Sequence, residues 1–502
     1  MLTNSTELDI LLLLSSIIFF LLYIFFTRNF NYWKRRGVPY KKPLPLVGNF
    51  LQVVRLKKNF AEVLAELYFE TNVPYLGIFI GDKPALLIKD LELSRNILVR
   101  DFQHFTDNSF ANRAGNISEY MVPFMKGKDW KLYRKFNTPA FSRATLKSAY
   151  FELIIEASNE LIEYLDTRLN NNENLINGKK LTEGYSAEML TSIALGAKGN
   201  CFRNENSKIL KMAHDLFNFI NLKRGISLAA YLLYPKLVNL LKLKLIDPIS
   251  ESEFKKVFFQ SVLKRKENEN TRQDLVGILM KWRREEREHI ELDDEKMVAQ
   301  AITFFLAAFE GITNVTVMAL YELAANLKIQ TKLREEIREY LNNSNLTFEA
   351  VFSELKYLDM VIKETLREYP PVAVFNRECT IDYRVPTTNF LIEKGTTLFI
   401  PSFAIQNDPE YFPNPDVFDP ERFSEFNSHK IKAGTYMPFS DGSRSCMGEK
   451  IGLTSVKVAV ARIIQNYQVD LRDDSQRKMK IDPKAYVLGP DEEKVTFKFK
   501  RV

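Results

Sequence analysis

A cysteine near the carboxyl end of the chain, Cys446, stands in the string FSDGSRSCMG at residues 439–448. The glycines of this string, Gly448 among them, tolerate backbone angles closed to other residues, so the chain can curl tightly and direct N–H groups at the sulfur. Phe439 would shield the sulfur from water, and Arg444 would pair with an acidic group and favour the thiolate over the thiol. The string therefore predicts a thiolate that binds the metal of a flat cofactor.

A cysteine in such a turn could also be a small core residue, which is the ordinary role of a free cysteine. That interpretation suits Cys201 and Cys379, whose neighbours form no comparable pattern. The spacing F-x-x-G-x-R-x-C-x-G around Cys446 instead resembles the haem-binding signature of the cytochrome P450 superfamily, in which the cysteine is the proximal ligand of the iron. The resemblance implies haem b (iron protoporphyrin IX) as the cofactor.

Two arginines and a glutamate match the same family. Glu364 and Arg367 lie three residues apart in LDMVIKETLREY, a segment that predicts a helix ending before Pro370. Alone, they would be a solvated surface pair of small energetic value. In the family, the arginine of a later PERF segment, here Arg422, completes a buried network with them. The resemblance thus implies a buried trio that fixes geometry more than it adds stability.

Three further residues match family positions that contact the haem propionates. Arg377 lies in NRECT, between the two segments just described. Trp130 and Arg134 lie four residues apart in WKLYR, on a predicted helix. Without Cys446, Trp130 would be taken for a core residue and Arg134 for a surface residue. With it, the resemblance implies that all three hold the cofactor.

The stretch FFLAAFEGITN at residues 304–314 aligns with the long helix that crosses the distal face of the haem in the family. Family members usually carry (Ala/Gly)-Gly-x-(Asp/Glu)-Thr there, and their acid and threonine hydroxyl hold water and feed protons to bound dioxygen. This chain keeps the acid as Glu310 but has Gly311 in place of the threonine. Thr313 points to another helix face, whereas Asn314 shares a face with Gly311 and could hold a water. The candidate catalytic positions are therefore Glu310, Gly311 and Asn314.

Three functions are compatible with this departure. The first is a haem-thiolate monooxygenase that oxidises lipophilic small molecules with dioxygen and electrons from NADPH, while Glu310 and water carry the protons. The second is a haem-thiolate isomerase or dehydratase that acts on oxygenated lipids without activating dioxygen, as in family branches that lack the threonine. The third is a haem protein that binds a ligand without turnover. The resemblance favours the monooxygenase.

The amino-terminal region departs from a globular pattern. Residues 10–26, ILLLLSSIIFFLLYIFF, carry no charge and are just long enough to cross a bilayer. A cleaved signal peptide is the competing interpretation, but Glu7 and Asp9 precede the run and no small-residue cleavage site follows it. Basic residues such as Arg28 follow instead, and these stay on the cytosolic side. We expect a membrane anchor at residues 1–27 and, by resemblance to microsomal members, a catalytic domain on the cytosolic face of the endoplasmic reticulum.

Residues 28–49 include GVPYKKPLPLVGN, whose prolines cannot continue a helix, and resemble the basic, proline-rich hinge of microsomal members. The motifs spread from Trp130 to Cys446 and would converge on one cofactor, so residues 50–502 are predicted to form one haem-thiolate catalytic domain. Its expected architecture is mainly α (α+β), the helix-rich cytochrome P450 fold with a small N-side β-sheet.

Local patterns place some elements of this fold. Apolar stretches at residues 74–80 and 84–88, separated by GDKP, predict a hairpin. Residues 297–330 form the longest helical stretch. Strand-like pieces return near residues 397–401 and 495–499.

A second apolar stretch, at residues 226–246, is not expected to span a membrane, because Pro235 interrupts it and lysines within it would be costly in lipid. It predicts either a pair of amphipathic helices packed on the core or, by resemblance, a lid over the substrate channel that dips into the membrane surface.

The formal net charge of +7 could suggest nucleic acid, but no base-reading motif accompanies it. By resemblance the partners are NADPH–cytochrome P450 reductase, possibly cytochrome b5, and a hydrophobic small-molecule substrate. The candidates for the reductase-docking face are basic residues near the motifs of the cysteine side: Lys131, Lys135, Arg143, Lys432 and Lys450.

The remaining sequence gives little about the reaction. Segments around residues 110–124, 304–310, 372–375 and 486–489 are apolar and favour an apolar substrate without identifying it. The four histidines, His214 among them, have no spacing typical of a metal site and are interpreted as structural or surface residues. Over its full length the chain looks most like the arthropod microsomal detoxification enzymes.

Overall fold

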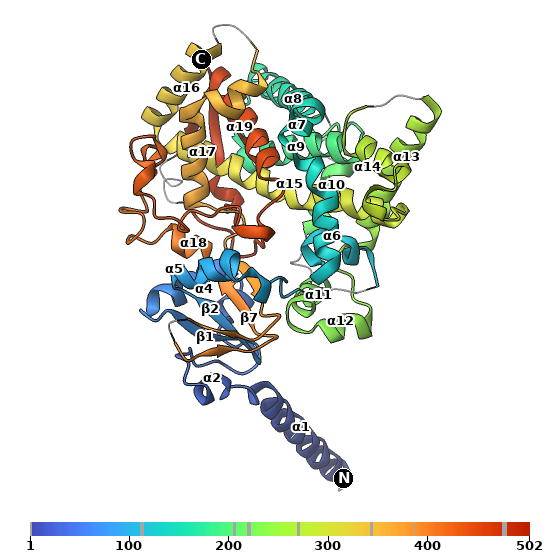
Figure 1. Cartoon of the computed structure of the whole chain (residues 1–502), viewed down its shortest axis with the longest axis vertical. Helices are drawn as coiled ribbons and strands as arrows, with labels where there is room; N and C mark the ends of the chain where they lie inside the picture. Colours follow the sequence, from blue (N-terminus) through green and yellow to red (C-terminus); the bar gives the residue numbers. More distant parts are fainter. Residues whose placement is uncertain are drawn as a thin grey trace. The chain divides into compact units, whose positions relative to one another are not determined.

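The computed structural model describes residues 3–110, 115–203, 207–217, 222–268, 272–341, 345–386, 388–473 and 479–502. The chain forms two compact units (Figure 1). The first comprises Met1–Ser109 and Val374–Pro401, and the second comprises Phe110–Ala373 and Ser402–Val502. The predicted mainly helical fold with small sheets is confirmed.

The first unit holds most of the strands. Its elements are α1 (Thr3–Thr27), α2 (Tyr32–Arg35), α3 (Leu51–Val54), α4 (Phe60–Glu70), β1 (Tyr75–Ile80), β2 (Lys83–Ile88), α5 (Leu91–Arg95), β4 (Phe375–Glu378), β5 (Tyr383–Arg384), β6 (Leu391–Ile392) and β7 (Thr397–Ile400).

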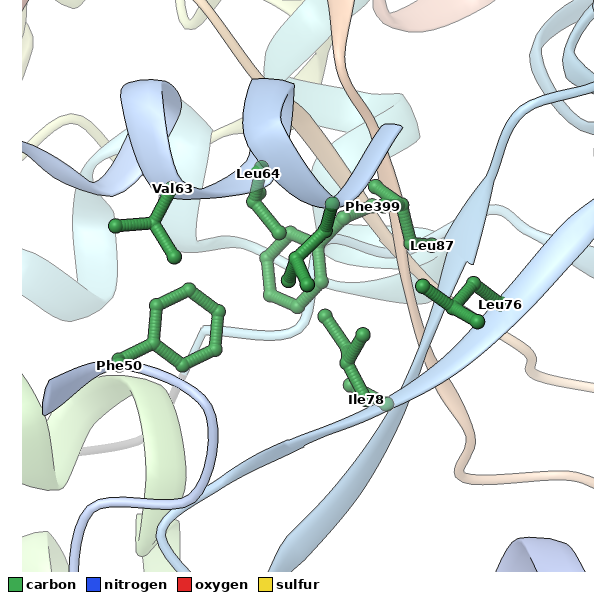
Figure 2. Packing of buried hydrophobic residues seen from close by; sticks show 9 residues of the cluster. Phe50, Val63, Leu64, Leu76, Ile78, Leu87 and Phe399 are labelled. Carbon is green, nitrogen blue, oxygen red and sulfur yellow. The ribbon is translucent and has the colours of Figure 1, made fainter. Parts of the chain in front are cut away.

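The larger sheet of the first unit has the strand order β1-β2-β7-β4. β1 and β2 pair antiparallel, which confirms the predicted hairpin. β7 comes from a distant part of the sequence and pairs parallel with β2, and β4 pairs antiparallel with β7. Figure 2 shows the core that this pairing creates, where Leu64 of α4 meets Ile78 of β1 and Phe399 of β7. Burial of these apolar side chains stabilises the sheet and joins the two halves of the unit.

Helix α1 contains the predicted anchor. Residues Glu7–Thr27 have a mean hydropathy of 2.7, and none of the residues in their apolar window is buried by the rest of the protein. The helix is long and apolar enough to cross a bilayer, which is consistent with a membrane anchor. Helix α15 of the second unit passes the same test of length and hydropathy, but it is mostly buried and is a core helix.

The segment after α1 packs closely on the sheet of the first unit. Trp33 is only 1% exposed, and its Nε1 donates a hydrogen bond to the carbonyl oxygen of Ile78 at 3.1 Å. A Cβ atom at Gly77 would lie 2.5 Å from the Trp33 ring, so only glycine leaves room for the indole. Arg28 also pairs with the fully buried Asp82 at 3.0 Å. The predicted hinge is therefore held against the strands by both apolar and ionic contacts.

The second unit is mainly helical. Its elements are α6 (Gly127–Asn137), α7 (Arg143–Thr145), α8 (Phe151–Asn170), β3 (Leu175–Asn177), α9 (Gly178–Leu190), α10 (Lys208–Phe217), α11 (Leu222–Leu233), α12 (Pro235–Leu241), α13 (Pro248–Asn268), α14 (Leu275–Arg284), α15 (Asp294–Ala325), α16 (Leu327–Leu341), α17 (Lys356–Glu368), α18 (Ser402–Gln406), α19 (Glu449–Asn466), β8 (Tyr467–Leu471) and β9 (Thr496–Arg501). β3, β9 and β8 form a three-stranded sheet.

Helix α15 is the centre of the second unit and packs against α9, α17 and α19. Asp293 caps its first turn by accepting a hydrogen bond from the backbone N–H of Lys296 at 2.8 Å. The helical stretch predicted for residues 297–330 is divided, because Asn326 leaves helical geometry and α16 begins at the next residue.

The carboxyl ends of α15 and α17 meet at a buried acidic cluster. The Tyr369 hydroxyl lies 2.8 Å from Glu322 Oε1 and 2.8 Å from Glu368 Oε1. Asn326 Nδ2 donates to the other oxygen of Glu322 at 3.3 Å. Two carboxyl groups thus share one tyrosine hydroxyl in the interior.

Residues 226–246 fold as α11, α12 and the turn after them. Tyr231 is fully buried and, with Ala230, Val238 and Leu245, forms an apolar cluster that packs against Phe124. This confirms a pair of helices with one face on the core. Leu240 and Leu241 are exposed on the other side, so contact of this region with a membrane stays a prediction.

Candidate active site

The loop before α19 holds Cys446 as the sequence predicted. Its backbone N–H donates to the carbonyl oxygen of Phe439 at 2.9 Å, which closes the loop. Gly442 has a φ of +72°, a conformation that favours glycine. The backbone N–H groups of Gly448 and Glu449 donate to the sulfur. The Cys446 side chain is nevertheless exposed, so one side of the sulfur faces open space.

The protein alone does not make this sulfur a thiolate. Desolvation by the surrounding protein raises the pKa of the Cys446 thiol, and the N–H donors together with the charge of Arg134 only partly oppose that effect. Arg134 thus adds its charge to the electrostatic role that the sequence predicted for Arg444. A coordinating metal ion deprotonates a thiol outright, so the loop is suited to a metal-bound sulfur.

Two arginines and a tryptophan surround the loop. Arg134 of α6 donates through Nη1 to the carbonyl oxygen of Ser445 at 2.6 Å. Arg444 donates through Nη2 to the carbonyl oxygen of Met125 at 2.9 Å, and its guanidinium lies 4.2 Å from the ring centre of the buried Trp130. The structure therefore brings three of the predicted cofactor-binding residues together next to Cys446.

The predicted network of Glu364, Arg367 and Arg422 is confirmed. Arg367 Nε lies 2.9 Å from Glu364 Oε2, and Arg422 Nε lies 3.2 Å from Glu364 Oε1. Glu364 and Arg367 are fully buried. Arg367 also donates to the carbonyl oxygen of Gln406 at 3.1 Å, and Gln406 in turn accepts from the backbone N–H of Met437 at 2.8 Å. The network thus ties α17 to the segment that leads into the cysteine loop.

Arg377, the remaining predicted propionate contact, belongs to β4 of the first unit. Its Nη1 donates to Asn108 Oδ1 at 3.1 Å and to the carbonyl oxygen of Asn376 at 2.8 Å. Burial lowers its pKa to about 10, because desolvation disfavours the cation. An anionic group placed beside this guanidinium would relieve that cost.

The middle of α15 has one open side. Ala307 is exposed, although most of the helix is buried. A Cβ atom added at Gly311 would meet nothing within 4 Å. A helix that packs tightly elsewhere in the core therefore leaves space at the position where the sequence lacks the threonine.

Asn314 is directed at the backbone and side-chain groups beside this space. Its Nδ2 donates to Glu310 Oε2 at 3.2 Å and to the carbonyl oxygen of Leu488 at 3.2 Å. Its Oδ1 is buried and accepts no hydrogen bond from the residues that the structure describes. A Cβ atom at Gly489 would lie 2.6 Å from Asn314 Nδ2, so glycine is required there. The free acceptor is the atom that could receive a water, as the sequence suggested.

Glu310 is partly buried, and desolvation raises the pKa of its carboxyl group above the usual value. The charges of Lys179 and His214 and the hydrogen bond from Asn314 lower it, while the charge of Glu183 raises it. His214 was interpreted from the sequence as a structural or surface residue, and the structure instead places it in the electrostatic environment of Glu310. No local motif could have shown this, since the interacting groups come from α9, α10 and α15.

The residues of this site fit a haem group. The exposed sulfur carries backbone donors, the arginines beside it suit carboxylates, and α15 leaves space at Gly311. The sulfur suits the metal of the cofactor, the arginines suit its acidic edge, and the space at Gly311 suits its distal face.

Comparison with known proteins gives the same result. A sequence profile of the Cytochrome P450 family matches residues 38–497. This chain belongs to the cytochrome P450 family. It is 34% identical to cytochrome P450 6j1 of Blattella germanica over 93% of both chains. It is 35% identical to the probable cytochrome P450 6v1 of Drosophila melanogaster, over 94% of this chain and 95% of that protein.

Membership confirms the predicted resemblance to arthropod cytochromes P450 and establishes the reaction class. The protein is a monooxygenase, an oxidoreductase whose cofactor is haem b held through a cysteine thiolate. Redox partners and hydrophobic substrates belong to this class. The roles of single residues in this chain are proposals, and they follow below.

Proposed function

We propose that this cytochrome P450 oxidises lipophilic small molecules, xenobiotics or endogenous lipids, at the cytosolic face of the endoplasmic reticulum, with electrons that NADPH supplies through a reductase. The observation that carries the proposal is the loop around Cys446, whose sulfur receives two backbone N–H groups and faces open space. When bound, haem supplies dioxygen activation at a thiolate-ligated iron.

The surrounding residues divide the work of holding this cofactor. Cys446 ligates the iron, Phe439 and Gly448 shape the loop, and the cations hold the propionates. The residues that hold the propionates are one aromatic residue and three cations: Trp130, Arg134, Arg377 and Arg444. Arginine suits this role because its guanidinium stays charged and meets a carboxylate with two donors.

On the distal side, Glu310 and Asn314 replace the missing hydroxyl. Glu310 holds or releases a proton beside the open space, and the buried Oδ1 of Asn314 fixes a water that passes the proton onward. Gly311 contributes room and no hydroxyl, so proton delivery depends on water rather than on a side-chain alcohol.

The substrate is apolar because the accessible surface of this region is apolar. Ala307 of α15 is exposed, and Val372 is 51% exposed within a segment that the sequence assigned to substrate contact. Tyr486 is 55% exposed although protein surrounds its hydroxyl closely enough to raise its pKa to about 12. Such surfaces gain free energy by covering an oily molecule.

Electrons enter from an acidic partner that docks on basic residues of the cysteine side. Of the predicted candidates, Lys135 pairs with Glu288 at 2.7 Å and Arg143 lies 4.2 Å from the ring centre of Phe352. Lys131 of α6 and Lys450 of α19 are exposed, and both helices adjoin the Cys446 loop. These two contribute most to docking of the reductase and of cytochrome b5.

Two experiments test the proposal. The reduced protein with carbon monoxide should show the Soret band of thiolate coordination, and Cys446→Ser should lose it. Purified protein with reductase, NADPH and lipophilic substrates should then give oxygenated product. Turnover that needs neither dioxygen nor reductant would overturn the proposal and favour the isomerase or dehydratase, which the absence of a hydroxyl at Gly311 allows. Ligand binding without any turnover would favour the non-catalytic alternative.

Gly311→Thr provides a sharper comparison, because the open space at this position accepts a larger side chain. We expect the variant to form more product for each NADPH consumed and less hydrogen peroxide. Gly311→Val is the matched control, since it fills the same space without a hydroxyl. An equal effect of both variants would show that volume, not proton supply, limits the reaction.

A further inference from the structure

A polar group made by three helices lies behind the distal acid. His214 of α10 places its Nε2 3.2 Å from Glu183 Oε2 of α9. The ring centre of His214 lies 6.5 Å from that of Phe309, the residue before Glu310 on α15. Lys179 of α9 completes the set of charges that act on both Glu310 and His214. The imidazole thus pairs with a second carboxylate and lies near enough to the distal acid for their charges to interact.

The two sides of this group differ in their access to solvent. The His214 side chain is 53% exposed, whereas that of Glu183 is 11% exposed. Asn314, which donates to Glu310, is 2% exposed. A proton can therefore reach His214 directly from bulk water. More deeply buried groups must receive protons from neighbouring protein groups.

We propose that His214, held by Glu183, is the residue through which protons enter the distal side and recharge Glu310, compensating for the absence of a hydroxyl at position 311. In this step an N–H bond of the imidazolium breaks and an O–H bond forms on the Glu310 carboxylate, with water carrying the proton between them. The positive and the negative charge disappear together. The neutral imidazole then takes a new proton from solvent on its exposed side.

The electrostatics of the group agree with this assignment. The hydrogen bond to Glu183 raises the pKa of His214, burial lowers it, and the charges of Glu183 and Glu310 raise it further. Burial raises the pKa of Glu310. The histidine is thus kept protonated to a higher pH than usual, and the acid that receives its proton is a better base than an exposed carboxylate. Lys179 opposes the protonation of His214.

His214 is a positioning and proton-supplying residue for the proposed monooxygenase reaction, and its role rests on that function. A first test is independent of turnover. The chain has four histidines, so the ring signals can be assigned by comparing wild type with His214→Gln in an NMR titration. We expect the pKa of His214 to lie above the ordinary value and to fall in both Glu183→Gln and Glu310→Gln.

Asp215→Asn is the control for this titration, because it removes a neighbouring charge on the same helix that is not part of the group. It should leave the pKa of His214 nearly unchanged. A His214 that titrates at the ordinary value, or that does not respond to Glu310→Gln, would overturn the inference whatever the enzyme catalyses.

The second test measures coupling, which is the product formed per NADPH consumed, as a function of pH. His214→Gln should reduce coupling by roughly tenfold and release more hydrogen peroxide. This is below the 10²–10⁴-fold effect of a general acid, because water still reaches Glu310. Wild-type coupling should fall as pH rises through the pKa of His214, and the variant should lose this dependence.

His214→Lys separates proton supply from charge pairing. Lysine keeps a cation beside Glu183 but holds its proton too tightly near neutral pH. If His214→Lys restores coupling, the pair is merely structural and the inference fails. If wild type makes no oxygenated product with reductase and NADPH, the proposed function fails instead, and the titration still tests the pairing.

Discussion

Replacement of Glu322 by glutamine should make the protein more stable at and above neutral pH. The Tyr369 hydroxyl has a single proton but lies 2.8 Å from an oxygen of Glu322 and 2.8 Å from an oxygen of Glu368. Two such short contacts between three oxygens require two protons, so one carboxyl group must be protonated. Burial raises the pKa of Glu322 from 4.5 to about 8, and the charge of Glu368 adds to this effect.

The size of the effect follows from linkage between protonation and folding. At low pH Glu322 is protonated in the folded and the unfolded chain, and its stabilising contribution is complete. Between pH 4.5 and about 8 only the unfolded chain loses the proton, so stability falls as pH rises. One unit of pKa corresponds to about 1.4 kcal/mol, which gives a loss of several kcal/mol by pH 8.

Glutamine can replace the carboxyl proton with an Nε2–H that donates to the Tyr369 hydroxyl oxygen, while its Oε1 accepts from Asn326 Nδ2, and it has no proton to lose. Thermal unfolding of wild type and Glu322→Gln should therefore give equal midpoints near pH 5 and a gap that widens to pH 8. The variant should be the more stable by about 2–4 kcal/mol at pH 8, which is less than the full linkage value because an amide N–H makes a weaker hydrogen bond than a carboxyl O–H. Glu339→Gln, an exposed acid on α16, is the control and should show no pH-dependent gap. A constant gap at all pH values, or a less stable variant at pH 8, would refute the shared proton.

Other changes have expected outcomes that follow from single contacts. Gly311→Ala should raise the free energy of unfolding by up to about 1 kcal/mol in the apoprotein, because the added Cβ meets nothing within 4 Å; a lower melting temperature would contradict the open space. Arg367→Met leaves Glu364 buried without its closest cation and should cost about 3–5 kcal/mol, measured by thermal unfolding together with haem content. Trp33→Ala should cost about 3–5 kcal/mol in the first unit, while the exposed Tyr23→Ala in α1 should cost almost nothing in detergent.

The parts of the structure that the sequence predicted best are those set by neighbours in the chain. The hairpin of β1 and β2 follows from two apolar runs around a turn, and the Cys446 loop follows from a contiguous pattern of glycines and donors. The pairing of Glu364 with Arg422 required knowledge of the family, because no local rule joins residues so far apart.

The parts that the sequence did not predict depend on tertiary packing. His214 acquires its role from Glu183 and Glu310, which lie on other helices, so helix periodicity alone could not connect them. Arg134 supplies charge at the sulfur because α6 packs beside the loop, and the local pattern around Cys446 gave no sign of it. The long helix ends at Ala325 and not at residue 330, since the local apolar pattern continues across the break at Asn326.

The seat of Trp33 between the strands has a practical consequence for production of a water-soluble form. Because the indole fills the space left by Gly77 and Arg28 reaches the buried Asp82, the folded body begins directly after the apolar helix. Deletion up to residue 27 removes a helix whose apolar window is not buried by the protein and loses the contact of Phe25 with Arg28, whereas a cut at the prolines would also remove Trp33 from the sheet. The useful truncation point is therefore Arg28, upstream of the prolines.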